Sequence, residues 1–181
     1  RVEFGTSVLL IGGESSGGHL AAATLLDLSE LLQLSRPGTS PFVAANLVYG
    51  IFDLSGTPSM RHFGGRPLVF NLPDFEWCCD LLLPPNTPRQ SPDVSPLYTS
   101  PALLQTMPPA LFTVGTDDPL LDDSLFMAAR WAAAGSELAV FPGGAHGLGH
   151  FGPHANTALG RAAQAKIMSF LRAQLDRADG A

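Results

Sequence analysis

The sequence has few charged residues and no cluster of basic ones. Charged side chains make up 14% of the 181 residues, and the formal net charge is −6 at pH 7. Nucleic acids and anionic membrane surfaces attract clustered lysine and arginine side chains, so the charge pattern argues against both as partners. No apolar stretch approaches the ~20 residues of a membrane-spanning helix. No secretory signal is visible either, which favours a cytoplasmic location over a secreted one.

Cysteine is almost absent as well. The two cysteines, Cys78 and Cys79, are neighbours in the chain. Because adjacent cysteines rarely bridge each other, the sequence implies no disulfide framework. Stability must come from an apolar core, and a chain of this length with 45% hydrophobic residues can build one. We therefore expect a single domain over residues 1–181.

Short apolar segments alternate with longer helical patterns along the chain. The apolar segments predict strands over residues 7–11, 46–52, 110–114 and 138–141. The helical patterns predict helices over residues 16–34, 118–134 and 154–175, the second with Pro119 at its first position. This alternation is typical of an α/β fold, in which helices flank a mostly parallel sheet. The proline-rich residues 54–101 predict an irregular insertion between the second and third strands, with a short helix over 72–83.

A glycine-rich turn follows the first predicted strand. Gly13 and Gly17 flank Ser15 at positions minus two and plus two, which is the G-x-S-x-G pattern of a nucleophile elbow. Small residues are expected there because larger side chains would collide with the neighbouring strand and helix. Ser16 fails the pattern because Glu14 stands two residues before it, and its backbone N–H is instead a candidate oxyanion donor. A glycine-rich helix start with serine caps, or a phosphate-binding loop, is the alternative.

Two residues could serve as partners of Ser15. A serine needs a base to accept its proton, and that base is usually a histidine oriented by a carboxylate. Asp118 follows the third predicted strand and His146 the fourth, and the carboxyl ends of parallel strands meet at one sheet edge. Asp118 could instead cap a helix that begins at Pro119, and Asp117 is the alternative acid.

Other titratable residues have simpler explanations. Asp122 and Asp123 are expected in the first turn of a helix, where they would complement its dipole. His146, His150 and His154 are spaced by four residues, but glycines and a proline interrupt any helix there, so we predict no metal site.

Aromatic residues are scattered through the insertion. Phe63 and Trp77 are candidate residues of a substrate pocket, as is His19 after the elbow, although core packing explains the aromatic residues equally well.

Several segments together resemble a known family. The sequence GESSGGHLAA from Gly13, PPALFTVGTDDPL from Pro108 and PGGAHG from Pro142 are similar to motifs of the hormone-sensitive-lipase-like esterases of the α/β-hydrolase superfamily. The resemblance runs from about Val2 to about Leu175. It implies a carboxylic ester hydrolase for short- to medium-chain esters, without a cofactor, in which Ser15 is the nucleophile, Asp118 the orienting acid and His146 the base.

The chain also departs from that family. It resembles only the last four strands of the eight-stranded sheet, and no H-G-G-G-type loop, which supplies oxyanion donors in the family, precedes Ser15. We expect residues 7–11 to form an apolar edge strand, which an N-terminal fragment of the same fold or a second copy would cover. A slow fragment that acts as a binding module, and a lactonase or peptidase with the same three residues, remain alternatives.

Overall fold

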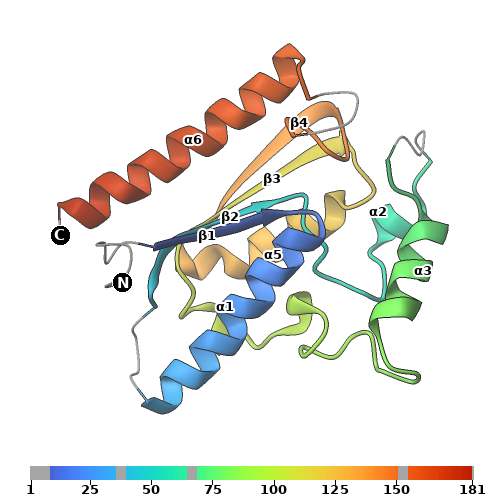
Figure 1. Cartoon of the computed structure of the whole chain (residues 1–181), viewed down its shortest axis with the longest axis horizontal. Coiled ribbons are helices and arrows are strands. Elements are labelled where there is room, and N and C mark those ends of the chain that lie inside the picture. The colour runs from blue at the N-terminus through green and yellow to red at the C-terminus, as the bar shows by residue number, and fades with distance from the viewer. Residues whose placement is uncertain (1–8, 36–39, 65–68, 151–154, 181) are drawn as a thin grey trace.

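A four-stranded parallel sheet forms the centre of the molecule (Figure 1). The computed structural model describes residues 9–35, 40–64, 69–150 and 155–180. Within these ranges the strands lie in the order β1-β2-β3-β4, and each pairs in parallel with its neighbour. Their bounds are β1 (Leu9–Glu14), β2 (Phe42–Val48), β3 (Ala110–Asp117) and β4 (Glu137–Ala145). The predicted α/β fold with a parallel sheet is therefore confirmed.

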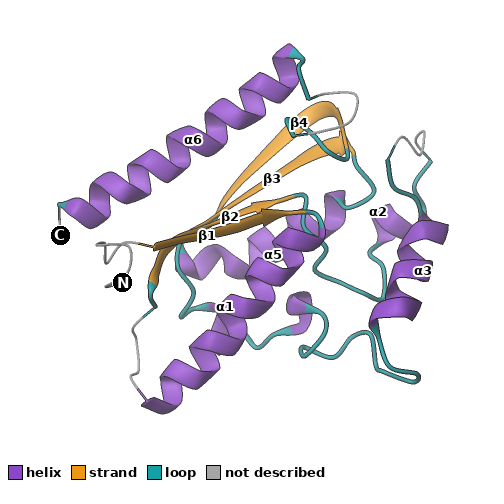
Figure 2. Ribbon diagram, viewed as in Figure 1, coloured by secondary structure: helices purple, strands orange, loops and turns teal. Residues whose placement is uncertain are grey.

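Helices cover both faces of this sheet (Figure 2). On one face lie α1 (Ser16–Ser35) and α5 (Leu121–Trp131), followed by the short η2 (Ala132–Ala134), and on the other lies α6 (Ala158–Asp179). Successive side chains of a strand point to opposite faces. Accordingly, Ala45 and Leu47 of β2 pack with α1 and α5, whereas Ala44 and Val48 pack with α6.

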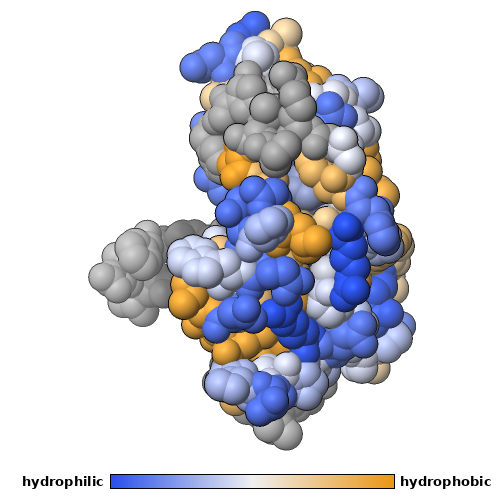
Figure 3. Space-filling view, turned by 90° about the vertical axis from the view of Figure 1, so that its right-hand side faces the viewer, coloured by the Kyte–Doolittle hydropathy of each residue, from blue (hydrophilic) through white to orange (hydrophobic). Residues whose placement is uncertain are grey.

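The predicted insertion lies between β2 and β3, at the carboxyl edge of the sheet (Figure 1). It holds α2 (Pro58–Arg61), α3 (Leu72–Leu82), η1 (Pro96–Tyr98) and α4 (Pro101–Leu104). Leu54, Met60, Phe75 and Cys79 form its own small core together with Leu120. Figure 3 looks onto this end of the molecule and shows hydrophobic surface among hydrophilic side chains. Large exposed apolar residues of this region are Val69, Trp77, Leu81 and Leu82.

Two predicted boundaries are wrong. The second strand was expected over residues 46–52 but ends at Val48, because Phe52 leaves the sheet and is buried in the core beside α1 and α5. The helix expected from residue 118 begins at Leu121, with Leu120 as its N-cap residue, so Pro119 precedes the helix. Asp118 is therefore not the cap.

The bounds of the first predicted strand and of the last predicted helix also differ from those of β1 and α6. Of the first predicted strand, residues 7 and 8 lie outside the described ranges, and β1 continues to Glu14. The last helix begins at Ala158, because the Thr157 side chain accepts a hydrogen bond from the Gly160 N–H and caps it. His154 lies outside the described residues. In the described part of the chain, no helix is long and apolar enough to cross a membrane.

Candidate active site

Ser15 occupies a tight turn between β1 and α1. Its φ is 54°, a left-handed conformation that is uncommon for a residue other than glycine. The Ser15 N–H donates to the Val48 carbonyl at 2.9 Å, which ties the turn to the end of β2. Strand, strained serine and helix follow one another as in a nucleophile elbow. The hydroxyl is thereby presented at the carboxyl edge of the sheet.

The glycines around Ser15 are not equivalent. A Cβ on Gly13 would lie 2.2 Å from the Gly17 carbonyl oxygen, so no side chain fits at position 13. A Cβ on Gly17 would meet nothing within 4 Å, contrary to the expectation that a side chain there would collide. The tight position is Gly18 instead, whose Cβ would lie 2.9 Å from the Gly50 Cα. The close approach between α1 and the end of β2 therefore depends on Gly18.

A chain of hydrogen bonds runs from Ser15 through His146 to Asp118. The Ser15 Oγ lies 3.0 Å from His146 Nε2, and His146 Nδ1 lies 3.1 and 3.0 Å from the two Asp118 carboxylate oxygens. A carboxylate can only accept, so the proton belongs on Nδ1 and leaves Nε2 free to accept from the serine hydroxyl. His146 is 4% exposed and Asp118 only 1%. The three predicted residues therefore come together at one buried site.

The neighbouring aspartate lines a narrow crevice beside His146, but its carboxylate forms a different hydrogen bond. Asp117 is exposed, and its carboxylate accepts a hydrogen bond from the Thr116 hydroxyl at 3.4 Å. Asp118 is further fixed by the Leu120 N–H, which donates to its Oδ1 at 2.9 Å. Backbone and histidine thus hold one carboxylate in a single orientation.

A cavity of about 210 Å³ lies beside Ser15. Its lining is mostly apolar, and α3 forms one wall of it. The lining residues are Ser15, Ser16, His19, Ile51, Leu54, Phe70, Phe75, Cys78, Cys79 and Leu82. Sequence reasoning did not single out Cys78, Cys79 or Leu82 as lining residues. Their spacing of three, four and seven residues from Phe75, which puts them on one helix face, was the signal available.

The three predicted pocket residues differ in position. His19 lines the cavity, its Nδ1 lies 3.0 Å from the Ile51 carbonyl oxygen, and burial lowers its pKa, so the ring is neutral at pH 7. Phe63 lies with Phe70 in a narrow crevice beside His146. Trp77 is 64% exposed and does not line the cavity, because it projects from a different face of α3.

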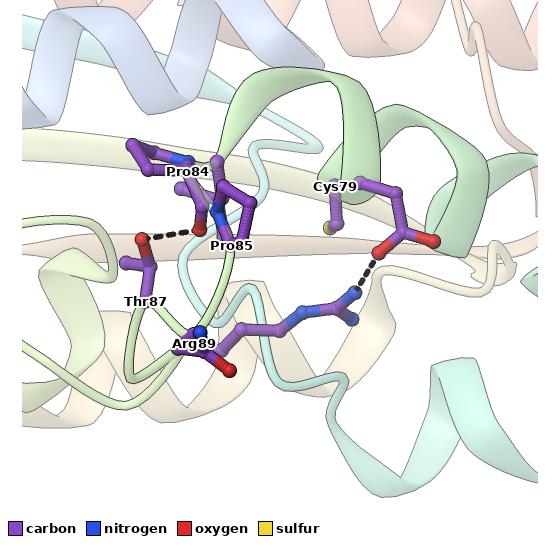
Figure 4. Close-up of a pocket in the computed structure, with 8 residues that line it drawn as sticks. Cys79, Pro84, Pro85, Thr87 and Arg89 are labelled. Atoms are coloured by element: carbon purple, nitrogen blue, oxygen red, sulfur yellow. Dashed lines mark hydrogen bonds and ion pairs between the residues drawn. The ribbon is translucent and has the colours of Figure 1, made fainter.

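A second cavity lies on the other side of Cys79 (Figure 4). It measures about 440 Å³ and is lined by Arg89 and the proline-rich turn after α3. Arg89 forms ion pairs with Glu76 at 2.5 Å and Asp80 at 2.8 Å. Neither Ser15 nor His146 lines this cavity, so the larger hollow offers no nucleophile beside a base.

Asp122 and Asp123 lie in the first turn of α5, as predicted, but their carboxylates also bond the insertion, and Asp123 anchors it. Asp123 is 1% exposed, and its carboxylate accepts from the N–H groups of Phe52 and Asp53 at 2.7 and 2.9 Å and from the Thr57 hydroxyl at 2.7 Å. Burial raises its pKa to about 7. Asp122 accepts from the Ser59 N–H at 2.8 Å. These contacts join α5 to the segment after β2, a role that sequence reasoning missed.

Comparisons with known proteins identify the fold. The family model of the alpha/beta hydrolase fold matches residues 2–150. An esterase from Gibberella moniliformis is 28% identical over 142 residues, which are 73% of this chain and 40% of that protein.

Solved esterase structures superpose well on the model. A thermostable esterase from Pseudomonas putida matches with a TM-score of 0.75 and 26% identity, over 86% of this chain and 47% of its own. A fungal esterase from Rhizomucor miehei matches with a TM-score of 0.76 at 24% identity, over 92% of this chain and 50% of its own. The chain thus spans about half the length of these relatives. By the match of its sequence and of its fold, the chain belongs to the alpha/beta hydrolase fold family, in the hormone-sensitive-lipase-like group that its motifs resemble.

Proposed function

We propose that the chain hydrolyses carboxylic esters with Ser15 as the nucleophile. The observation that carries the proposal is the hydrogen-bonded series from Ser15 Oγ through His146 to Asp118, next to an apolar cavity. His146 Nε2 accepts the serine proton as Oγ bonds to the carbonyl carbon. The same nitrogen then returns the proton to the leaving alcohol, and water hydrolyses the acyl-enzyme by the same route. Asp118 orients the ring and stabilises its positive charge.

The start of α1 is the proposed source of one oxyanion donor. Ser16 is the first residue of α1, so its N–H has no partner within the hydrogen-bond ladder of that helix. Gly13 lets the backbone turn tightly around Ser15 at this point, because no side chain fits there, whereas Gly17 has room for one. Donors aimed at the developing oxyanion stabilise the transition state, and losing one costs on the order of 10²–10³ in rate. The reaction needs no cofactor.

The proposed substrates are small esters with short to medium acyl chains. The cavity volume of about 210 Å³ lies below the ~300–1,000 Å³ typical of sites for drug-sized ligands. Its one titratable ring, His19, carries no charge at pH 7 because burial lowers its pKa. An apolar, uncharged lining favours esters over charged peptides, and lactones are the second candidate class because they present the same carbonyl group.

We also propose that a further segment covers the edge of β1. Among the described residues, β1 pairs with β2 alone, and Leu20 of the adjoining α1 is 64% exposed. An apolar edge strand with unpaired N–H and C=O groups attracts another strand. An N-terminal segment of the same fold is the first candidate and a second copy of the chain the other. Light scattering and intact mass separate them, and a monomer of 19.0 kDa with esterase rates typical of the family would contradict both.

A fluorophosphonate probe tests the proposed nucleophile. We expect labelling at Ser15 that His146→Gln abolishes and that Ser136→Ala leaves intact, since Ser136 stands at the amino end of β4 and bonds the Ala128 carbonyl. Hydrolysis of p-nitrophenyl acetate, butyrate and octanoate then measures the substrate range, with rates falling as the acyl chain lengthens. A folded chain that takes no label would instead support a binding module.

A further inference from the structure

Three polar side chains outside the proposed catalytic residues meet beside His146. Tyr49 Oη lies 2.5 Å from Glu14 Oε2 and 3.2 Å from His150 Nδ1, and that nitrogen lies 3.4 Å from the same Glu14 oxygen. Glu14 ends β1, Tyr49 directly follows β2, and His150 lies in the loop after β4. The group therefore joins the carboxyl ends of three strands.

The hydrogen bonds of this group have one consistent direction from donor to acceptor. The Glu14 carboxylate can only accept, so the Tyr49 hydroxyl donates to it. His150 Nδ1 then donates to the Tyr49 oxygen, since its other close neighbours, the Leu148 carbonyl oxygen at 3.3 Å and the Glu14 oxygen at 3.4 Å, also only accept. Burial and the hydrogen bond to Glu14 raise the pKa of Tyr49, so the phenol keeps its proton.

Tyr49 is held in an uncommon backbone conformation. Its φ is 34°, and its N–H donates to the Thr113 carbonyl at 2.7 Å. The residue has no exposed surface. Strained residues such as this persist where the surrounding structure fixes them, and they cluster at functional sites. Among the described residues, the other non-glycine residue with a positive φ at a strand end is Ser15 itself.

The Tyr49 ring also contacts the catalytic histidine. Its centroid lies 4.8 Å from that of His146 at an interplanar angle of 59°, while Phe70 stacks on the same ring at 5.5 Å and 29°. The imidazole is thus held by two aromatic rings. Glu14 is bonded through its peptide to Ser15, and His150 follows His146 by four residues, so the three polar side chains connect the two loops that carry nucleophile and base.

We propose that Glu14, Tyr49 and His150 form a clamp whose function is to position His146 against Ser15. The proposal rests on the proposed function, because it assigns positioning residues to that same site. A ring that only filled space would need no hydroxyl, whereas the clamp acts through the hydrogen bond from Tyr49 to Glu14. Small displacements of reacting groups lower rates strongly, which makes the labelling rate of Ser15 a sensitive measure.

The test compares the two tyrosines of the chain. Tyr49→Phe removes the clamp hydroxyl and keeps the ring, and we expect Ser15 to react with fluorophosphonate about 10-fold more slowly. Tyr98→Phe is the matched control, because its hydroxyl bonds Asp53 at 3.0 Å and the substitution removes the same atom, and its labelling rate should equal that of the wild type. Equal rates for the two variants would overturn the clamp.

A double-mutant cycle tests whether Glu14 and Tyr49 act as one unit. Glu14→Ala should slow labelling as much as Tyr49→Phe, and the double variant should be no slower than either single variant. Glu14→Gln keeps an acceptor oxygen and should recover part of the rate. Effects that multiply in the double variant would contradict the clamp.

A measurement that needs no catalysis keeps the two proposals apart. The NMR relaxation of the His146 ring Cε1–H, assigned with His146→Gln, should show a more mobile ring in Tyr49→Phe than in the wild type or in Tyr98→Phe. An unchanged ring overturns the clamp even if Ser15 is labelled. A more mobile ring in Tyr49→Phe, together with a wild-type chain that takes no label, would support the clamp while the proposed esterase fails.

Discussion

The two cavities that meet at Cys79 differ in size and in chemistry. The larger, about 440 Å³, contains Arg89, whose charge is already matched by Glu76 and Asp80. The smaller, about 210 Å³, is mostly apolar but opens onto a serine hydroxyl, with a histidine 3.0 Å from its oxygen. In the larger cavity every strong polar group has an oppositely charged partner. In the smaller one, the polar groups are arranged to pass a proton.

This difference shows why cavity volume alone does not identify a site. The charges of Arg89, Glu76 and Asp80 neutralise one another at a partly exposed position, which costs little free energy. At Ser15 the structure instead maintains a strained backbone and a buried carboxylate next to a histidine. Such features reduce stability and persist where they have a function.

The largest effect should come from removing the charge of Asp118, whose carboxylate bonds His146 Nδ1. Asp118→Asn keeps the acceptor for the Leu120 N–H but removes the charge that fixes the proton on His146 Nδ1. We expect the rate of ester hydrolysis to fall on the order of 10⁴-fold, with the fold intact by circular dichroism. Asp117→Asn is the matched control on the adjacent, exposed residue, and its rate should stay near that of the wild type. Similar losses in both variants would contradict the role of Asp118.

Sequence reasoning could group Ser15, Asp118 and His146 at one edge of the sheet because their signals are local. The glycine spacing singles out Ser15, and the positions of Asp118 and His146 after predicted strands place them at one edge of a parallel sheet. The fold class follows from alternation of apolar and helical patterns in the same way. Each inference needed only short-range spacing and one rule about parallel sheets.

The walls of the site could not be predicted in this way. The insertion has no regular hydrophobic period, so the sequence does not determine which face of α3 points toward Ser15. The sequence therefore predicts Trp77 as a pocket residue, whereas Cys78 and Leu82 line the cavity in the structure. The contact between Glu14 and Tyr49 depends on the pairing of β1 with β2, which brings residues 35 positions apart together. Both features arise from tertiary packing, which leaves no periodic signal in the sequence.

The next largest effect concerns Cys79, which lines both cavities. Burial raises the pKa of the Cys79 thiol to about 11, so at pH 8 only about 0.1% of it is the reactive thiolate. Iodoacetamide should therefore modify the exposed Cys78 first, and the modification of Cys79 should be on the order of 10²-fold slower. Peptide mapping by mass spectrometry after short exposure measures both rates. Equal rates would mean that α3 opens readily and that the two cavities exchange with solvent.

A smaller effect is expected from narrowing the apolar cavity. Leu82 lines it and Leu81, the adjacent residue on α3, does not, although the two are similarly exposed at 63% and 68%. Leu82→Trp should reduce the rate on p-nitrophenyl butyrate about 10-fold relative to the acetate, because the larger side chain occupies the space of one or two methylene groups. Leu81→Trp should leave the ratio unchanged. A changed ratio in Leu81→Trp alone would place the acyl chain outside this cavity.

The smallest effect should come from the ion pairs of the larger cavity. Arg89 is 25% exposed in its side chain, while Glu76 and Asp80 are 46% and 75% exposed, so water screens much of their attraction. Arg89→Met, which keeps an apolar stem of similar length, should lower the free energy of unfolding by no more than ~1 kcal/mol. Lys166→Met, which breaks the exposed pair with Glu137 between α6 and β4, is the reference and should cost less still. Urea unfolding at low and high salt measures both, and the difference in the free energy of unfolding between Arg89→Met and the wild type should shrink as salt rises.

Labelling of Ser15 should be unaffected in Arg89→Met, since Arg89 lines the other cavity. A loss of several kcal/mol, accompanied by slower labelling, would show that the larger cavity supports the wall of the smaller one and that the two are coupled through α3.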